Sequence, residues 1–339
     1  RPHHRQAVPG PPSQPARRAD RQRHGMNGTG GRRVIRAARI AGLMAALLVV
    51  AAAVTLGFRP GAPPAAAGTP VVEIHSAHGA SFVPALQGKR PLFILALGSD
   101  ARPGQRVDRQ RADSIHLIGI DRSRTHATVL GFPRDSWVHI PGFGTSKINS
   151  AMVDGGPALM VKTIESITGI RVDFWMLTSF GGLRRMVDYI GGLTVTVPYA
   201  MHDRYSGANF KAGPIHMRGW QALAFARNRH DTPNGDFSRS QNQGRLFLAA
   251  LAQLGKQFPA NPAVLFTWIS AGWRNVSTDL PPSTLLDLAL TATQVEPRNV
   301  NNLVVPGSTG TAGGASVVFV SPSAHSVFAD MRKDGLAGR

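Results

Sequence analysis

The 339-residue sequence contains no cysteine and has half as many acidic as basic residues, 19 against 38. Without cysteine the chain forms neither disulfides nor cysteine-ligated zinc sites, so a folded domain has to rely on its hydrophobic core. With 42% hydrophobic residues, the sequence has enough apolar material for one. The shortage of acids leaves a net charge of +19, which indicates an acidic partner or an acidic surface.

The sequence also lacks the arrangements that mark several enzyme classes. It contains no nucleophile-elbow motif and no recognisable Ser-His-Asp arrangement. Its histidines are scattered and do not have the spacing of metal ligands. One of them, His230, stands between Arg229 and Asp231 and is a minor candidate for a substrate contact.

Positive charge is concentrated at the N-terminus. Residues 1–39 hold ten arginines (1, 5, 17, 18, 21, 23, 32, 33, 36 and 39) against one acid, Asp20, and we expect a disordered basic cytoplasmic tail there, with Met26 as a candidate start. Residues 40–58 are uncharged and long enough to span a hydrocarbon core of ~30 Å as a transmembrane helix. The arginines before this segment predict a cytoplasmic N-terminus and an extracytoplasmic remainder. A signal peptide cleaved near residues 65–68 is the alternative.

A Pro/Ala/Gly linker over residues 59–80 leads into an extracytoplasmic domain over 81–339. Apolar and periodic segments alternate along this domain, which predicts a layered α/β/α fold with a central, mostly buried mixed sheet. Strands are expected at 91–98, 114–121, 126–132, 173–178, 193–198, 302–306 and 316–320. Helices are expected at 149–168, 180–190, 218–226, 238–258, 281–295 and 321–336, and a flexible loop at 310–314.

Two carboxylates bracket the first strand connection. Asp100 follows the first apolar strand, and Asp113 opens the next strand thirteen residues later. Strand ends are where α/β folds place ligands, so both acids are expected at one edge of the sheet. Together with phosphate oxygens and water, they suit Mg²⁺. Taken singly, each acid is also typical of a turn or a cap.

Basic residues follow the next strands. Pro133 ends the third strand and directs Arg134 toward the same edge, and Lys147 comes shortly after it with no acid directly adjacent in sequence. We interpret these residues as a basic rim of the site, with a solvated surface as the alternative.

A third cluster lies between residues 226 and 243. Arg227 and Arg229 are two positions apart, so both side chains point to one face if the segment is extended. Asp236, Arg239 and Gln243 follow at the start of the next expected helix. Arginine presents a planar fork of donors that matches phosphate oxygens in pairs. A solvated loop of mixed charge is the alternative.

Seven motifs in order closely resemble the LytR-CpsA-Psr family of bacterial envelope proteins. They cover residues 91–255, and together they are highly specific although each one is short. The motifs are LGSDAR (97–102), RADS (111–114), FPRDS (132–136), KINSA (147–151), VDYIGGL (187–193), GWQALAFARNR (219–229) and GDFSR (235–239).

The resemblance implies an extracytoplasmic, membrane-anchored phosphotransferase. Its donor would be a glycopolymer on a polyprenyl-pyrophosphate carrier, its acceptor a peptidoglycan hydroxyl and its cofactor Mg²⁺. The metal-binding acids correspond to Asp100 and Asp113, which with Arg134 and Arg227 are the expected catalytic residues. The expected substrate-binding residues are Arg134, Lys147, Arg227, Arg229, Asp236, Arg239 and Gln243, with Asp236 ordering the arginines.

One position departs from the family pattern. The family usually carries a second arginine directly before the glutamine of its last motif, where this chain has Asn242. The substitution removes a charge, and we expect it to weaken diphosphate binding or to mark a different donor. The lipid tail needs an apolar slot, for which residues 220–225, 246–254 and 174–176 are candidates, although core packing is the commoner role of each.

Two other functions remain open. A pyrophosphatase that transfers the lipid diphosphate to water would use the same site. A membrane-bound transcriptional regulator would explain the basic charge, but an anchor followed by an exported domain argues against nucleic acid as a partner. Teichoic acid, capsule and arabinogalactan are all compatible as the polymer.

Overall fold

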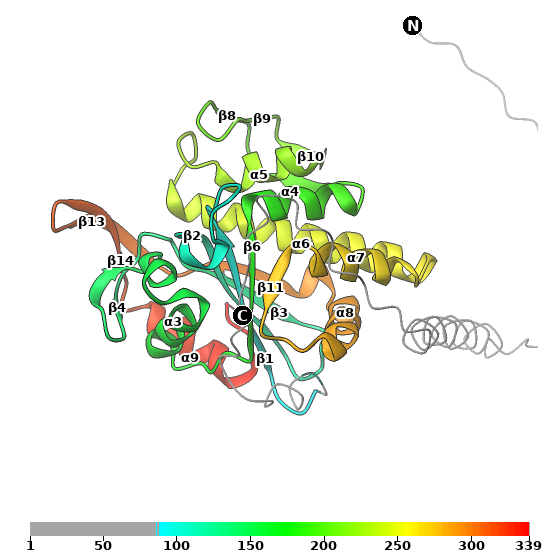
Figure 1. Ribbon diagram of the computed structural model, residues 1–339, viewed down its shortest axis with the longest axis horizontal. Helices are drawn as coiled ribbons and strands as arrows, with labels where there is room; N and C mark the ends of the chain where they lie inside the picture. The colour runs from blue at the N-terminus through cyan, green and yellow to red at the C-terminus, as the bar shows by residue number, and fades with distance from the viewer. Residues whose placement is uncertain (1–85, 87, 339) are drawn as a thin grey trace, which may run out of the picture. The chain divides into compact units, whose positions relative to one another are not determined.

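The computed structural model describes residues 86 and 88–338, and the expected tail, transmembrane helix and linker lie outside these residues. Within the described ranges, no helix has the length and apolar character needed to cross a membrane. The expected α/β architecture is confirmed, because a six-stranded sheet in the order β11-β6-β1-β2-β3-β12 forms the centre (Figure 1).

The central sheet is mixed. Its strands are β1 (Leu92–Ser99), β2 (Ala112–Ile120), β3 (Ala127–Gly131), β6 (Phe174–Ser179), β11 (Val276–Thr278) and β12 (Val300–Val304). The pairs β1–β6 and β3–β12 are parallel, whereas β1–β2, β2–β3 and β6–β11 are antiparallel. The apolar runs of β1, β2 and β3 are buried, as expected for strands that are covered on both faces.

Helices cover both faces of this sheet. α3 (Ser150–Thr168) and α9 (Ala324–Asp334) share a hydrophobic cluster with one face, through residues such as Leu95 and Leu117. α6 (Asp236–Ala260) and α8 (Leu285–Gln294) cover the other face, where Ile94 and Val129 point. Because side chains alternate along a strand, neighbouring residues of β1 contribute to two different clusters.

A third hydrophobic cluster lies beyond α6, at the top of Figure 1. It is built by α4 (Phe180–Tyr189), α5 (Gly219–Arg227), the pair β7 (Leu193–Val197) and β10 (Gly213–Met217), and the hairpin β8 (Met201–Asp203) and β9 (Ala208–Phe210). The helix α7 (Val264–Trp273) contacts α4, α6 and α8. The long helix α6 therefore separates this third cluster from the central sheet.

Several element boundaries were predicted and others were missed. α3 ends at Gly169, which has φ of 65°, as the glycine after an expected helix should. α8 begins later than expected, because Pro281 and Pro282 lead into a short 3-10 turn. The expected flexible loop at 310–314 is wrong: β13 (Gly307–Ala312) and β14 (Ala315–Val320) form a hairpin. The short hairpin of β4 (Trp137–Ile140) and β5 (Gly144–Lys147) was also not predicted.

Candidate functional site

A β-bulge between β1 and β2 gives Asp113 its orientation. Gly98 pairs with Ser114, whereas the next residue of β1, Ser99, pairs with Ala112, which leaves Asp113 unpaired between them. A bulge of this kind re-aims a side chain. The carboxylate of Asp113 accepts a hydrogen bond from Nη1 of Arg134 and lines a large cavity.

Asp100 lies directly beyond β1, beside Asp113. Its backbone N–H donates to the carbonyl of Arg111 at 3.1 Å. Burial raises the pKa of Asp100, and the negative charge of Asp113 raises it further, while Arg134 and Arg111 act in the opposite direction. Both acids therefore lie at the same end of the β1–β2 pair, although only Asp113 is among the residues that line the cavity.

This pair of acids fits a cation that takes few ligands from the protein. Among the described residues, no group of three or more histidine, cysteine, aspartate or glutamate side chains converges on one point. Mg²⁺ is commonly held by one or two carboxylates, with water and substrate phosphates completing its octahedron. Asp100 and Asp113 therefore suit Mg²⁺ and do not suit an ion that needs a full set of protein ligands.

The same cavity is lined by four arginines, Arg134, Arg227, Arg229 and Arg239. The segment 227–229 is not extended throughout, because Arg227 is the last residue of α5, while Asn228 after it has extended backbone angles. Both arginines still line the cavity, while Asn228 between them is buried. Arg227 therefore reaches the cavity from the end of a helix, and Arg229 reaches it from the loop that follows.

Asp236 forms ion pairs with two of these arginines, Arg229 and Arg239. Its Oδ1 lies 3.6 Å from Nη1 of Arg229 and 3.2 Å from Nη2 of Arg239. The side chain of Arg239 is only 6% exposed. Burial lowers the pKa of Arg239, and the negative charges of Asp236 and Asp113 oppose that effect. Asp236 itself does not line the cavity, so this geometry fits its expected role in ordering the arginines.

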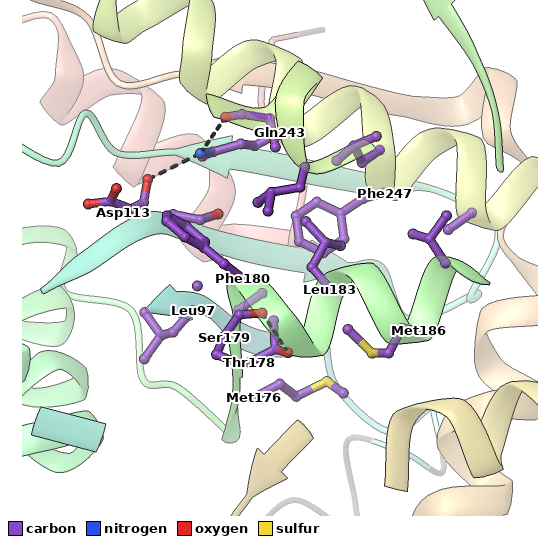
Figure 2. Close-up of a pocket in the computed structure, with 18 of the residues that line it drawn as sticks. Leu97, Asp113, Met176, Thr178, Ser179, Phe180, Leu183, Met186, Gln243 and Phe247 are labelled. Carbon is purple, nitrogen blue, oxygen red and sulfur yellow. Dashed lines mark hydrogen bonds between the residues drawn. The ribbon is translucent and has the colours of Figure 1, made fainter. Parts of the chain in front are cut away.

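Gln243 joins the two sides of the site. Its side-chain Nε2 donates to the carbonyl oxygens of Asp113 and Ala226, each at 3.1 Å (Figure 2). These bonds connect α6 to the beginning of β2 and to the last turn of α5. The amide nitrogen is thereby committed to the backbone, although Gln243 also lines the cavity.

Lys147 differs from the expectation. Although no acid adjoins it in sequence, its Nζ lies 3.3 Å from Oδ1 of Asp135, and the same oxygen is 3.7 Å from Nε of Arg134. The unopposed basic rim is therefore wrong at this position. Lys147 is not among the residues that line the cavity, so its contact with substrate stays a prediction.

Asn242 is not among the described residues that line the cavity. Its side chain is fully buried, and its Oδ1 accepts a hydrogen bond of 2.9 Å from Nη1 of Arg245, one helical turn further along α6. Its Nδ2 has no partner among the described residues. The expected weakening of diphosphate binding stays a prediction.

Behind the arginines, the cavity of about 600 Å³ becomes apolar. Leu183 and Met186 of α4 and Phe247 of α6 line it, together with Met176 of β6 (Figure 2). The apolar candidates of the sequence divide between two roles. Those that line the cavity are Met176, Leu223, Leu246, Phe247 and Ala250, whereas Phe174, Trp175 and Phe225 are core residues and Trp220 is 54% exposed.

Three side chains of the site were not predicted as functional. The ring of Phe180 lies 5.2 Å from the guanidinium carbon of Arg227, a cation–π contact. Tyr205, at the turn of the β8–β9 hairpin, lines the cavity. His116, beneath the site, bonds Ser114 Oγ and the Ser240 carbonyl at 3.1 Å each, and burial lowers its pKa to about 4. The available signal was the position of His116 within the apolar run from Ile115 to Ile120.

A comparison of the whole sequence with known protein families agrees with the order of these motifs and with the cavity that their residues share. The LytR_cpsA_psr family matches residues 68–333. The chain belongs to this family. A probable cell wall biosynthesis protein LcpB of Corynebacterium glutamicum is 36% identical over 169 residues, which are 47% of this chain and 41% of that protein. A polyisoprenyl-teichoic acid–peptidoglycan teichoic acid transferase TagU of Bacillus mycoides is 32% identical over 199 residues, 58% of this chain and 63% of the relative.

Solved structures share the fold. The crystal structure of Bacillus subtilis TagV is 25% identical, has a TM-score of 0.58, and covers 72% of this chain and 95% of its own. Protein gbs0355 from Streptococcus agalactiae is 22% identical with a TM-score of 0.64, over 76% of this chain and 91% of its own. The central mixed sheet is therefore the sheet of the LytR_cpsA_psr fold.

Proposed function

We propose that this LytR_cpsA_psr protein is a phosphotransferase that moves a glycopolymer from a polyprenyl-pyrophosphate carrier to a hydroxyl of peptidoglycan. One observation carries the proposal: a single cavity joins a mouth of four arginines to an apolar interior. An amphiphile with a diphosphate head and a long prenyl tail has the same division of charge. The name of the TagU relative supports the proposal, because it describes a teichoic acid transferase that acts on polyisoprenyl-teichoic acid and peptidoglycan.

The arginines have the main part in the proposed reaction. Phosphoryl transfer requires positioning and neutralisation of charge more than covalent help from the protein. Arg134, Arg227, Arg229 and Arg239 would together hold the diphosphate oxygens. Asp236 and Gln243 keep this set in place through the ion pairs and hydrogen bonds already described. Preorganised donors of this kind stabilise the charge that develops during transfer.

We also propose Mg²⁺ as the cofactor, held by Asp100 and Asp113. When bound, the ion would neutralise diphosphate charge and help to orient the phosphoryl group. The raised pKa of Asp100 supports this proposal. Two neighbouring ionised carboxylates repel each other, and a bound cation would offset that repulsion.

The membrane location is a further part of the proposal. Residues 40–58 would anchor the chain as a single transmembrane helix, with the N-terminus in the cytoplasm and the catalytic domain outside. This arrangement would bring the apolar cavity within reach of a lipid carrier.

A reconstituted reaction tests the function. The full chain, purified in detergent, is mixed with a short-chain prenyl diphosphate oligosaccharide and Mg²⁺, with and without a peptidoglycan oligosaccharide. Release of prenyl monophosphate together with a glycan coupled to peptidoglycan through phosphate is the expected result. Prenyl monophosphate without any coupled product would replace the transferase by a pyrophosphatase, and no turnover at all would overturn both.

A further inference from the structure

A histidine and a buried aspartate lie together at the mouth of the cavity. Nδ1 of His230 is 3.1 Å from Oδ2 of Asp203, whose side chain is 1% exposed, whereas that of His230 is 43% exposed. Burial acts to raise the pKa of Asp203, but hydrogen bonds from the Tyr205 backbone N–H and from His230 outweigh it and lower the pKa. The carboxylate is therefore ionised and accepts the Nδ1 hydrogen, which leaves Nε2 as the acceptor of the ring.

The β8–β9 hairpin fixes the orientation of this ring. His202 and Asp203 are consecutive residues of the hairpin, and they bond consecutive residues of the loop that follows α5. The backbone N–H of His202 donates to the carboxylate of Asp231, and the carboxylate of Asp203 bonds Nδ1 of His230. The ring of Tyr205 packs on that of His230 with centroids 4.6 Å apart. The imidazole is thus held at Nδ1 by Asp203 and on one face by Tyr205. It lines the same cavity as the four arginines.

Few groups in this cavity are able to accept a proton near neutral pH. Among the described residues that line it, the candidates are Asp113 and His230, since the other ionisable lining residues are arginines and a tyrosine. One carboxylate oxygen of Asp113 already accepts a hydrogen bond from the guanidinium of Arg134. If Asp113 also holds a cation, it becomes a still poorer base. His230 has no such competitor for Nε2 among the described hydrogen bonds.

We propose that His230 is a catalytic residue of the transfer, with Nε2 taking the proton of the acceptor hydroxyl, and that Asp203 is its positioning residue. This inference rests on the proposed function. As the hydroxyl proton passes to Nε2, the acceptor oxygen forms a bond to the phosphorus that carries the glycan. The bond from that phosphorus to the bridging oxygen breaks, and its electron pair leaves with the prenyl monophosphate. The exposed edge of the imidazolium then releases the proton to water.

Charged and aromatic groups surround His230. Asp203 and Tyr205 contact it from the hairpin, and Arg229 and Asp231 flank it in its own loop. The guanidinium of Arg204 lies over the ring of Tyr205.

The variant His230→Gln removes the base while keeping a hydrogen-bonding side chain at a partly exposed position. The expected result is a loss of about 10²-fold in kcat, with KM for the lipid donor within about twofold. Asp203→Asn should lower kcat at least about tenfold with the same KM. An amide at this position can donate to Nδ1 of His230, which leaves the ring proton on Nε2, the nitrogen that has to accept. His139→Gln, at an exposed position of β4 (Trp137–Ile140) that does not line the cavity, is the matched control and should behave as the wild type.

The outcomes separate this inference from the proposed function. If the wild type couples glycan to peptidoglycan while His230→Gln keeps its kcat, the proton acceptor lies elsewhere and the transferase assignment stands. If the wild type couples nothing, the proposed function fails first. Thermal unfolding of each variant shows whether the fold is intact, and the exposed His230 decides the question even if Asp203→Asn does not fold.

Discussion

The side-chain nitrogen of Gln243 lies 3.1 Å from the backbone oxygen of Asp113 and 3.1 Å from that of Ala226. One amide thereby fixes the distance between the bulged acid and the arginine-bearing end of α5. Because both partners are carbonyls, this position needs a donor, and a carboxylate there would face two acceptors.

Gln243→Glu should therefore lower the free energy of unfolding by about 1–3 kcal/mol, because a buried acceptor loses its bonds and meets other acceptors. Turnover should fall with it. Chemical denaturation and the coupled transfer reaction measure the two effects. Gln241→Glu is the control, since Gln241 is exposed on the same helix. Equal stability of the two variants would contradict the bridging role of Gln243.

Arg227→Ala should reduce kcat by about 10²- to 10³-fold with little change in thermal stability, because Arg227 is an exposed residue at the end of α5 that lines the cavity. Arg227→Lys should recover only a small part of the rate, since an ammonium does not offer the planar fork of donors. Arg298→Ala, at an exposed ion pair with Glu296, is the control. Near-normal rates in Arg227→Ala would remove the central residue of the proposed site.

Asp100→Asn should abolish turnover at ordinary Mg²⁺ concentrations and yet raise the melting temperature. The raised pKa of Asp100 means that its ionised form is disfavoured in the folded protein, so removing the charge relieves repulsion with Asp113. In the wild type, chelation should stop the reaction and added Mg²⁺ should restore it. Activity should also be lost at a higher pH than for an ordinary carboxylate. Asp154→Asn, at an exposed position of α3, serves as the control for both measurements.

Asn242→Arg should destabilise the protein by about 1–3 kcal/mol without strengthening donor binding. The larger side chain would enter a fully buried position beside the guanidinium of Arg245. Adding Arg245→Gln to this variant should recover part of the stability, because it removes the competing charge and volume. Scanning calorimetry tests the pair, and tighter binding of the prenyl diphosphate donor by Asn242→Arg would reinstate the position as part of the site.

His116 should make stability depend on pH in the mildly acidic range. Its pKa falls from 6.5 to about 4 in the folded protein, so the unfolded chain binds the additional proton between these values. Stability from this source is complete above pH 6.5 and is lost as the pH falls toward 4, by about 3 kcal/mol in total. His116→Gln should flatten this part of the profile in urea unfolding between pH 4.5 and 7.5. A profile parallel to the wild type would show that other groups dominate.

The elements that sequence predicts best are those whose pattern is local. The continuous apolar run of β1 and the glycine after α3 carry their own physical signal, and both appear where expected. The convergence of Asp100 and Asp113 was also predictable, because it follows from two strands that share a sheet edge. The family resemblance supplied the arginine set, and the structure brings Arg134, Arg227, Arg229 and Arg239 to one cavity.

The features that escaped prediction depend on contacts between distant residues. No local pattern shows that Asp135 neutralises Lys147, because the two meet only when β5 returns along β4. Likewise, Asp203 and His230 are separated by 27 residues and lie on a short hairpin and a loop. The burial of Asn242 and its hydrogen bond with Arg245 were also not predicted, because spacing alone does not show which helix positions are packed.

The apolar part of the cavity lies between two hydrophobic clusters, that of α4, α5 and β7 and that of the sheet, α6 and α8. A prenyl chain in this space would act as core material that the polypeptide itself does not supply. Donor supply and folding would then be thermodynamically linked, since a ligand that binds only the folded form stabilises it in proportion to the logarithm of its concentration. A cell short of lipid-linked polymer would hold a less stable enzyme, and the lifetime of the protein would report on the pool of its substrate.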